Sequence, residues 1–256
     1  MSKFADKLRS LSKSSSAPIG FHPAVSAVRS PSMLLIVGLS ETRVKEARTM
    51  ADIAADAGLI VSEGTGAKTV KQVIEAVGDV PLGVFVKGMC ETEIDELVSL
   101  GCDFVVFDIG GVAAILSKKE VGKFLMIEPS LDQGLVRAIN SFEVDGVLIS
   151  GGGDSVMTVE RLLVCRRSVE LLEKPVIMML PSLVTKEELI RLWQAGVDAV
   201  VSASAESTDA LFELKKMLGD LPRRARNRRA TAGVVLPRYG GDVIGEEDEQ
   251  EEKIEP

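Results

Sequence analysis

Eight short runs of apolar residues follow one another along the chain, and each precedes a stretch with helical spacing of apolar positions. The runs are continuous and do not alternate with polar residues, which is typical of strands buried on both faces of a parallel sheet. We therefore predict eight strand–helix units. The predicted strands are residues 31–37, 57–62, 81–86, 101–107, 123–127, 144–150, 175–180 and 196–202, and the predicted helices are residues 41–57, 68–77, 92–100, 112–117, 131–142, 158–172, 185–195 and 208–218.

The second, fourth, sixth and eighth predicted strands begin with similar small or acidic residues. Gly58, Asp103, Asp145 and Asp198 lie at these starts, at intervals of roughly two strand–helix units. This spacing indicates a four-fold internal repeat of about two strand–helix units. Eight strand–helix units within the length of one domain predict the α/β class and a single closed (β/α)8 barrel, the TIM barrel.

The segments on either side of the predicted barrel have other patterns. Phe4, Leu8 and Leu11 have helical spacing and predict a short amphipathic helix at the N-terminus. Residues 246–256 contain seven acidic residues, one lysine and no aromatic residue, which predicts a disordered acidic tail. The predicted divisions are an N-terminal helix and connector at 1–30, the barrel at 31–220, and a basic segment with the acidic tail at 221–256.

Composition and charge narrow the classes of function. The 256 residues are 46% hydrophobic, enough for a barrel core, but no apolar run reaches the ~20 residues that span a bilayer. Most of the net charge of −8 lies in the tail, so a nearly neutral barrel gives no reason to expect nucleic acid as a partner. The five arginines of residues 223–229 predict a solvated segment, or one that docks on another protomer or an anionic partner. A homo-oligomer therefore stays among the expected assemblies.

The spacing of the cysteines and the place of the single histidine give no reason to expect a disulfide, a zinc site or histidine catalysis. Three cysteines without Cys-x-x-Cys spacing argue against disulfides and structural zinc, and favour a reducing, cytoplasmic location. Cys102 and Cys165 are expected in the core, and Cys90 in a loop. His22 precedes the first strand, where the non-catalytic end of a barrel is expected, so we do not expect histidine catalysis.

Ionisable residues follow the second to fifth strands, at the ends where barrels of this kind carry their active sites. Glu63, Lys87, Asp108 and Glu128 follow these four strands in turn. Neighbouring strands are ~4.8 Å apart, so Asp108 could pair with Lys87 and keep it protonated. Lys87 would then be a proton donor or an anion clamp, with Asp108 and Glu128 as bases. Glu63, Asp108 and Glu128 could also hold Mg²⁺, or all four residues could form a structural ion-pair network.

Glycine and hydroxyl residues follow the sixth to eighth strands. Consecutive glycines let backbone N–H groups approach a phosphate closely, and a following helix adds a favourable dipole. The alternative is that the glycines serve only the turn. The predicted anion-binding residues are Gly151, Gly152, Gly153, Ser182, Ser202 and Ser204.

The Ala-Gly-Val-Asp-Ala-Val-Val segment at 195–201 resembles strand starts in the phosphate-binding (β/α)8 barrels. That group includes sugar-phosphate epimerases, indole-glycerol-phosphate and thiamine-phosphate synthases, orotidine-phosphate decarboxylase and FMN-dependent oxidoreductases. The architectural resemblance spans about residues 31–218. It implies a phosphate near the loops after the seventh and eighth strands, which carry Ser182 and Ser202 in place of the group's glycines. Lys87 is similar to the lysine of the decarboxylase-like members, whose Asp-x-Lys-x-x-Asp pattern is absent.

These observations predict an enzyme that acts on a small anionic, phosphorylated metabolite by proton transfer or carbon–carbon bond cleavage, a lyase or an isomerase. Mg²⁺ is the cofactor that the carboxylates suggest. Two alternatives remain open. One is an FMN-dependent oxidoreductase whose glycine loop approaches the flavin. The other is a non-catalytic barrel that serves as a binding or assembly subunit.

Overall fold

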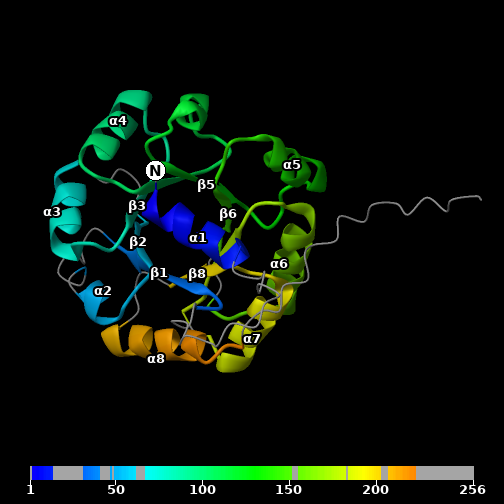
Figure 1. Ribbon diagram of the computed structural model, residues 1–256. Coiled ribbons are helices and arrows are strands. Elements are labelled where there is room, and N and C mark those ends of the chain that lie inside the picture. The colour runs from blue at the N-terminus through cyan, green and yellow to red at the C-terminus, as the bar shows by residue number, and fades with distance from the viewer. Residues whose placement is uncertain are drawn as a thin grey trace, which may run out of the picture. The chain divides into compact units, whose positions relative to one another are not determined.

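Within the described residues, eight parallel strands form one closed barrel in chain order, with β8 paired to β1 (Figure 1). The computed structural model describes residues 2–13, 31–40, 47, 49–61, 67–151, 155–182, 184–202 and 207–222. The predicted tail at 246–256 and the basic run at 223–229 lie outside these residues. The strands are β1 (Leu34–Leu39), β2 (Ala57–Ile60), β3 (Leu82–Phe85), β4 (Phe104–Phe107), β5 (Gly122–Ile127), β6 (Gly146–Ile149), β7 (Val176–Met179) and β8 (Ala199–Val201).

Helical segments surround the barrel, and two of the predicted helices differ from expectation. Of the predicted helix at 41–57, only Thr49–Asp52 is an α-helix within the described part, and it ends before Ala54, whose φ of 53° is left-handed. The predicted helix at 112–117 is a short 3-10 helix. The helical segments are α2 (Thr49–Asp52), α3 (Ala67–Val77), α4 (Glu91–Ser99), η2 (Ala113–Ser117), α5 (Gln133–Ala138), η3 (Ile139–Ser141), α6 (Val159–Leu171), α7 (Lys186–Ala195) and α8 (Thr208–Gly219).

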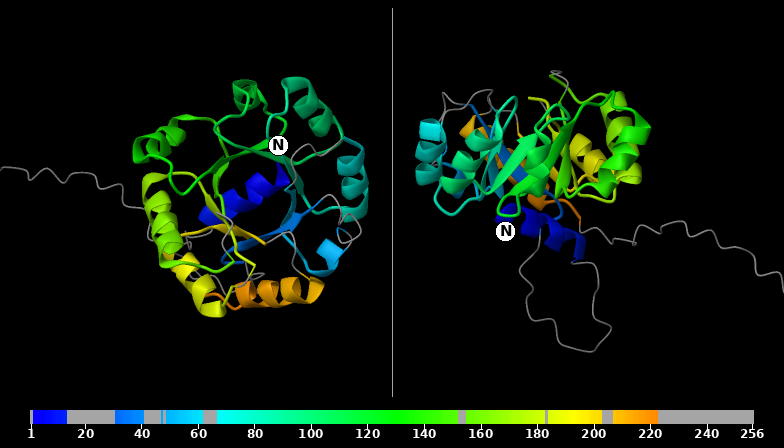
Figure 2. Two further views of the ribbon diagram at one scale, coloured as in Figure 1. Left: turned by 180° about the vertical axis from the view of Figure 1, so that it is seen from behind. Right: turned by 90° about the horizontal axis from the view of Figure 1, so that it is seen from above.

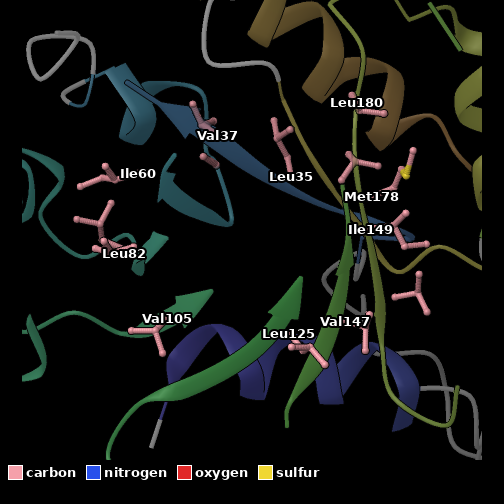
Figure 3. Packing of buried hydrophobic residues seen from close by; sticks show 14 of the residues in the cluster. Leu35, Val37, Ile60, Leu82, Val105, Leu125, Val147, Ile149, Met178 and Leu180 are labelled. Carbon is pink, nitrogen blue, oxygen red and sulfur yellow. The ribbon is translucent and has the colours of Figure 1, made fainter. Parts of the chain in front are cut away.

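Each strand buries side chains on both of its faces, which explains the continuous apolar runs. Leu35, Leu125 and Val147 belong to the cluster between the sheet and the helices, and Figure 3 shows Leu125 and Val147 on the neighbouring strands β5 and β6. Ile36 and Leu148, the next residues along β1 and β6, belong to a second cluster inside the barrel. Alternating side chains therefore fill two separate cores, as expected of a barrel whose interior is packed.

Aspartates at the starts of the even-numbered strands bind backbone N–H groups of the neighbouring strand. The Leu35 N–H donates to Asp56 Oδ2 at 3.0 Å, and the Lys123 N–H donates to Asp145 Oδ2 at 2.8 Å. The Val176 N–H donates to Asp198 Oδ2 at 3.0 Å. Two of the acidic strand starts noted in the sequence, Asp145 and Asp198, therefore satisfy backbone donors at the amino-terminal end of the barrel, and Asp56, which directly precedes β2, does the same.

Asp103 has the equivalent place before β4, but its carboxylate holds the N-terminal helix. The backbone N–H groups of Lys3 and Phe4 donate to it at 2.8 and 3.0 Å, and the Ser2 hydroxyl donates at 2.7 Å. A carboxylate at this position satisfies donors that a helix start otherwise leaves unpaired. The sequence-predicted N-terminal helix is thereby confirmed as α1 (Lys3–Lys13).

Helix α1 closes the amino-terminal end of the barrel (Figure 2). Phe4 and Leu8 are buried in the interior cluster. The Phe4 ring lies 4.9 Å from that of Phe104 and 5.4 Å from that of Phe124, between ring centroids, and the rings are tilted as aromatic pairs prefer. Arg9 adds an ion pair to Asp145. The opposite, carboxyl-terminal end of the barrel therefore remains for a functional site.

The three cysteines are placed as the sequence predicts, with Cys102 and Cys165 buried and Cys90 exposed. Burial raises the pKa of both the Cys102 and the Cys165 thiol to about 12. At pH 8 less than about a thousandth of either buried thiol is then a thiolate, the reactive form. We expect a thiol reagent to modify one cysteine per folded chain, Cys90, and three after denaturation. Rapid modification of a second cysteine in the folded protein would contradict this burial.

Candidate functional site

The candidate residues follow strands that all end at the carboxyl-terminal rim of the barrel. Lys87, Glu128 and Ser182 are exposed, whereas Asp108 and Gly151 are half-buried. These residues come from the ends of five different strands, as in other barrels of this architecture. Four further candidates lie outside the described residues: Glu63, Gly152, Gly153 and Ser204.

Asp108 occupies a turn. Its Oδ1 accepts the backbone N–H of Gly110 at 2.9 Å, so the carboxylate shapes the chain after β4. Asp108 also lines an apolar pocket on the outside of the barrel, which neither Lys87 nor Glu128 lines. The three side chains therefore do not share this pocket. Their catalytic roles stay predictions.

The sequence also predicts a metal site made of carboxylates. Among the described residues, no group of three or more histidine, cysteine, aspartate or glutamate side chains gathers closely enough to hold a metal ion. Glu63, one of the three predicted ligands, lies outside those residues. The Mg²⁺ hypothesis therefore stays a prediction about Glu63, Asp108 and Glu128.

Ser202 is part of the seam that closes the barrel. Its side chain is buried, and its Oγ accepts the backbone N–H of Gly38 in β1 at 3.1 Å. The hydroxyl proton takes no part in this bond, so the group keeps a donor for a further acceptor. Ser202 thus makes a structural bond across the β8–β1 junction, and its anion-binding role stays a prediction.

Arg161 is a candidate that the sequence reasoning missed. It lies in the first turn of α6, and its backbone N–H donates to Oγ1 of the capping residue Thr158 at 3.3 Å. The residue is only 5% exposed. Its Nη2 lies 3.5 Å from the point that a Cβ at Gly151 would occupy, and the Cβ of Met179 lies 3.4 Å from the same point. A guanidinium is therefore packed against the chain at the ends of β6 and β7.

The positive charge of Arg161 affects the pKa of a neighbouring thiol. For Cys165, one turn further along α6, burial is the main influence on the pKa and raises it, whereas the arginine charge acts to lower it. Arg161 therefore brings a positive charge and a helix N-terminus to Gly151, the one predicted anion-binding glycine within the described residues. The sequence signal for this residue is an arginine in the first turn of the helix that follows the glycine loop.

None of the described helices combines the length and the apolar character needed to cross a membrane. The chain matches no protein-family model and no curated protein.

Solved structures with a similar fold include the alpha subunit of tryptophan synthase from the hyperthermophile Pyrococcus furiosus. One mutant of that subunit has a TM-score of 0.58 and 15% identity, and the match covers 75% of this chain and 98% of that chain. Tryptophan synthase from M. tuberculosis in its aminoacrylate-bound form has a TM-score of 0.59 and 11% identity, covering 86% of this chain and 98% of that chain. These likenesses, at 15% and 11% identity, support the (β/α)8-barrel fold of this chain.

Proposed function

We propose that this chain is an enzyme that binds a small phosphorylated metabolite at the carboxyl-terminal rim of the barrel and acts as a lyase or an isomerase. The observation that carries the proposal is the buried Arg161 guanidinium beside Gly151. Arginine presents a planar set of N–H donors that matches phosphate oxygens in bidentate pairs. Its place in the first turn of a helix adds a dipole that favours an anion.

The remaining candidate residues supply the rest of this proposed site. Gly152, Gly153 and Ser204 would extend the anion cradle begun by Gly151 and Ser202. On the other half of the rim, Lys87 would donate a proton to the reacting group or hold its charge. Glu63 and Glu128 would accept a proton or bind Mg²⁺, which would supply charge neutralisation at the substrate. Asp108 lines the outer pocket, so it has no role at the substrate in this proposal.

The solved structures of similar fold support this proposal by analogy only. They include subunits of tryptophan synthase, so this architecture is used by an enzyme that makes an amino acid. Because one fold hosts many functions, the residues of this chain and not the likeness must decide the reaction. Proton transfer and carbon–carbon bond cleavage are the reactions for which a protonated lysine and nearby carboxylates are suited.

Inorganic phosphate is the simplest probe of the proposed anion site. We expect Arg161→Gln to weaken phosphate binding at least about 10-fold in isothermal titration calorimetry, because a charged hydrogen-bond donor is lost. Arg161→Lys should have an intermediate effect, since it keeps the charge without the bidentate geometry. Circular dichroism would show that each variant is folded.

The matched control is Arg166→Gln. Arg166 is exposed on the same helix and is paired with Glu170 at 2.7 Å, so the same chemical change there should leave phosphate affinity within about twofold. Equal phosphate affinity in folded Arg161→Gln and Arg166→Gln would refute an anion site at Arg161.

A further inference from the structure

An apolar pocket of about 290 Å³ lies outside the barrel wall, against β4 and β5. Phe107 and Leu125 form its floor on these two strands, and Ile115 and Ile139 line it from the helical segments η2 and η3. All four belong to the cluster between the sheet and the helices. The pocket is therefore a gap in the outer helical layer and not part of the barrel interior.

Short helical segments leave this gap. The segment after β4 is a 3-10 helix of 5 residues, and α5 after β5 has 6 residues, whereas α6 has 13 and α8 has 12. The short segment η2 lies between α4 and α5 in the helical ring (Figure 1). Its end is fixed by Lys123, whose Nζ donates to the Leu116 carbonyl at 2.7 Å. The outer face of β4 and β5 is thus covered by shorter helical segments than those that follow β6 and β8.

Exposed apolar side chains concentrate at this pocket. Ile109, Val112, Leu135 and Phe142 are between 39% and 70% exposed, and all four line it. They are half of the eight large hydrophobic residues that are exposed in the described part of the chain. Single exposed apolar residues are ordinary, but a group around one concavity marks a binding surface.

One charge lies against this apolar surface. Asp108 is the only ionisable residue among the described residues that line the pocket. Its Oδ1 accepts the Gly110 N–H, and no hydrogen bond within the described residues uses its other oxygen, Oδ2. The pocket therefore offers an apolar wall together with one carboxylate, which complements a ligand that carries one positive charge.

We propose that this pocket binds a small amphipathic amine, with its apolar body against Phe107 and Leu125 and its ammonium group beside Asp108. An apolar cavity of ~150 Å³ is known to bind benzene, so about twice that volume suits a bicyclic ring or a short branched chain. The site is distinct from the anion site at Arg161 and goes beyond the proposed function. Its failure would leave the phosphate titration unaffected.

Three naphthalene derivatives test the proposal by calorimetry on the full chain. We expect the 2-naphthylmethylamine cation to bind about 10-fold more tightly than the uncharged 2-naphthylmethanol. The carboxylate anion of 2-naphthylacetic acid should bind most weakly, because its charge has the same sign as that of Asp108. Asp108→Asn removes the charge and keeps an oxygen that can accept the Gly110 N–H. In this variant the amine and the alcohol should bind within about twofold of each other.

A second pair of variants tests the location. Ala138→Trp places an indole against the pocket from an exposed position on α5, and it should abolish amine binding. Ala210→Trp makes the same change at an exposed position on α8, away from the pocket, and should leave binding intact. Equal binding of amine and alcohol, no binding of either, or amine binding that survives Ala138→Trp would overturn the proposal. A stable dimer that Ala138→Trp dissociates would assign the pocket to a second copy of the chain instead.

Discussion

Phe104→Ala is expected to lower the free energy of unfolding by about 3–5 kcal/mol, the usual cost of removing a buried aromatic ring. Phe104 is buried in the interior cluster, and its ring centroid lies 4.9 Å from that of Phe4 and 5.3 Å from that of Phe124. The ring also fills the space beside Gly83, where a Cβ would lie 2.1 Å from Phe104 Cε2. Alanine would leave a cavity between α1 and the strands. Urea unfolding followed by the fluorescence of Trp193 would measure the loss.

Phe212→Ala is the matched control for this substitution. Phe212 lies on α8 and is 44% exposed, so the same loss of a ring should cost less than about 1 kcal/mol. If the two variants unfold at the same urea concentration, the aromatic cluster does not stabilise the closed end of the barrel. A large loss for Phe104→Ala alone would support the packing of α1 against the barrel interior.

Lys87→Ala is expected to reduce kcat at least about 100-fold once a phosphorylated substrate is turned over, the lower range for loss of a general acid. This expectation rests on the proposed function. Lys87 follows β3 at the rim, and Asp108 follows the neighbouring strand β4. A protonated amine there can deliver a proton to a leaving group or stabilise a developing negative charge, and alanine can do neither.

Lys119→Ala provides the comparison for Lys87→Ala. Lys119 is also exposed, but it precedes β5 and so lies toward the opposite end of the barrel. Its replacement should leave kcat within about twofold of the original value. A near-native kcat for Lys87→Ala would assign that lysine to structure and remove it from the proposed mechanism.

The strands could be predicted from the sequence because burial on both faces leaves a local signal. The strands β1, β4 and β7, which contain Leu35, Val105 and Val176, have no polar residue at any position, whichever core each side chain enters. The helical layer was less predictable, since the 3-10 form of η2 and the end of α2 at Asp52 depend on how the chain returns to the next strand. The acidic lead-ins were visible in the sequence. Their partners were not, because the N–H groups that Asp145 and Asp198 accept lie on neighbouring strands.

The candidate site, too, could be predicted from the sequence only in part. Parallel strands in a closed barrel place Lys87, Asp108 and Glu128 at one rim, so the fold alone locates them there. Side-chain direction depends on the local turn, and Asp108 is turned toward Gly110 and the outer pocket. Arg161 was missed because an arginine early in a helix usually faces water. Its burial results from packing against Gly151 and β7, which no short sequence pattern encodes.

Native mass spectrometry tests the central claim, a phosphorylated metabolite bound at the rim beside Arg161. Full-length protein would be incubated with a small-molecule extract of cells, desalted, and compared with folded Arg161→Gln and Arg166→Gln. The account predicts that the original chain and Arg166→Gln retain a compound that releases a phosphate-containing fragment, whereas Arg161→Gln does not. Retention of FMN would contradict the proposed reaction class. Retention of no phosphate-containing compound, or equal retention by all three proteins, would contradict the site itself.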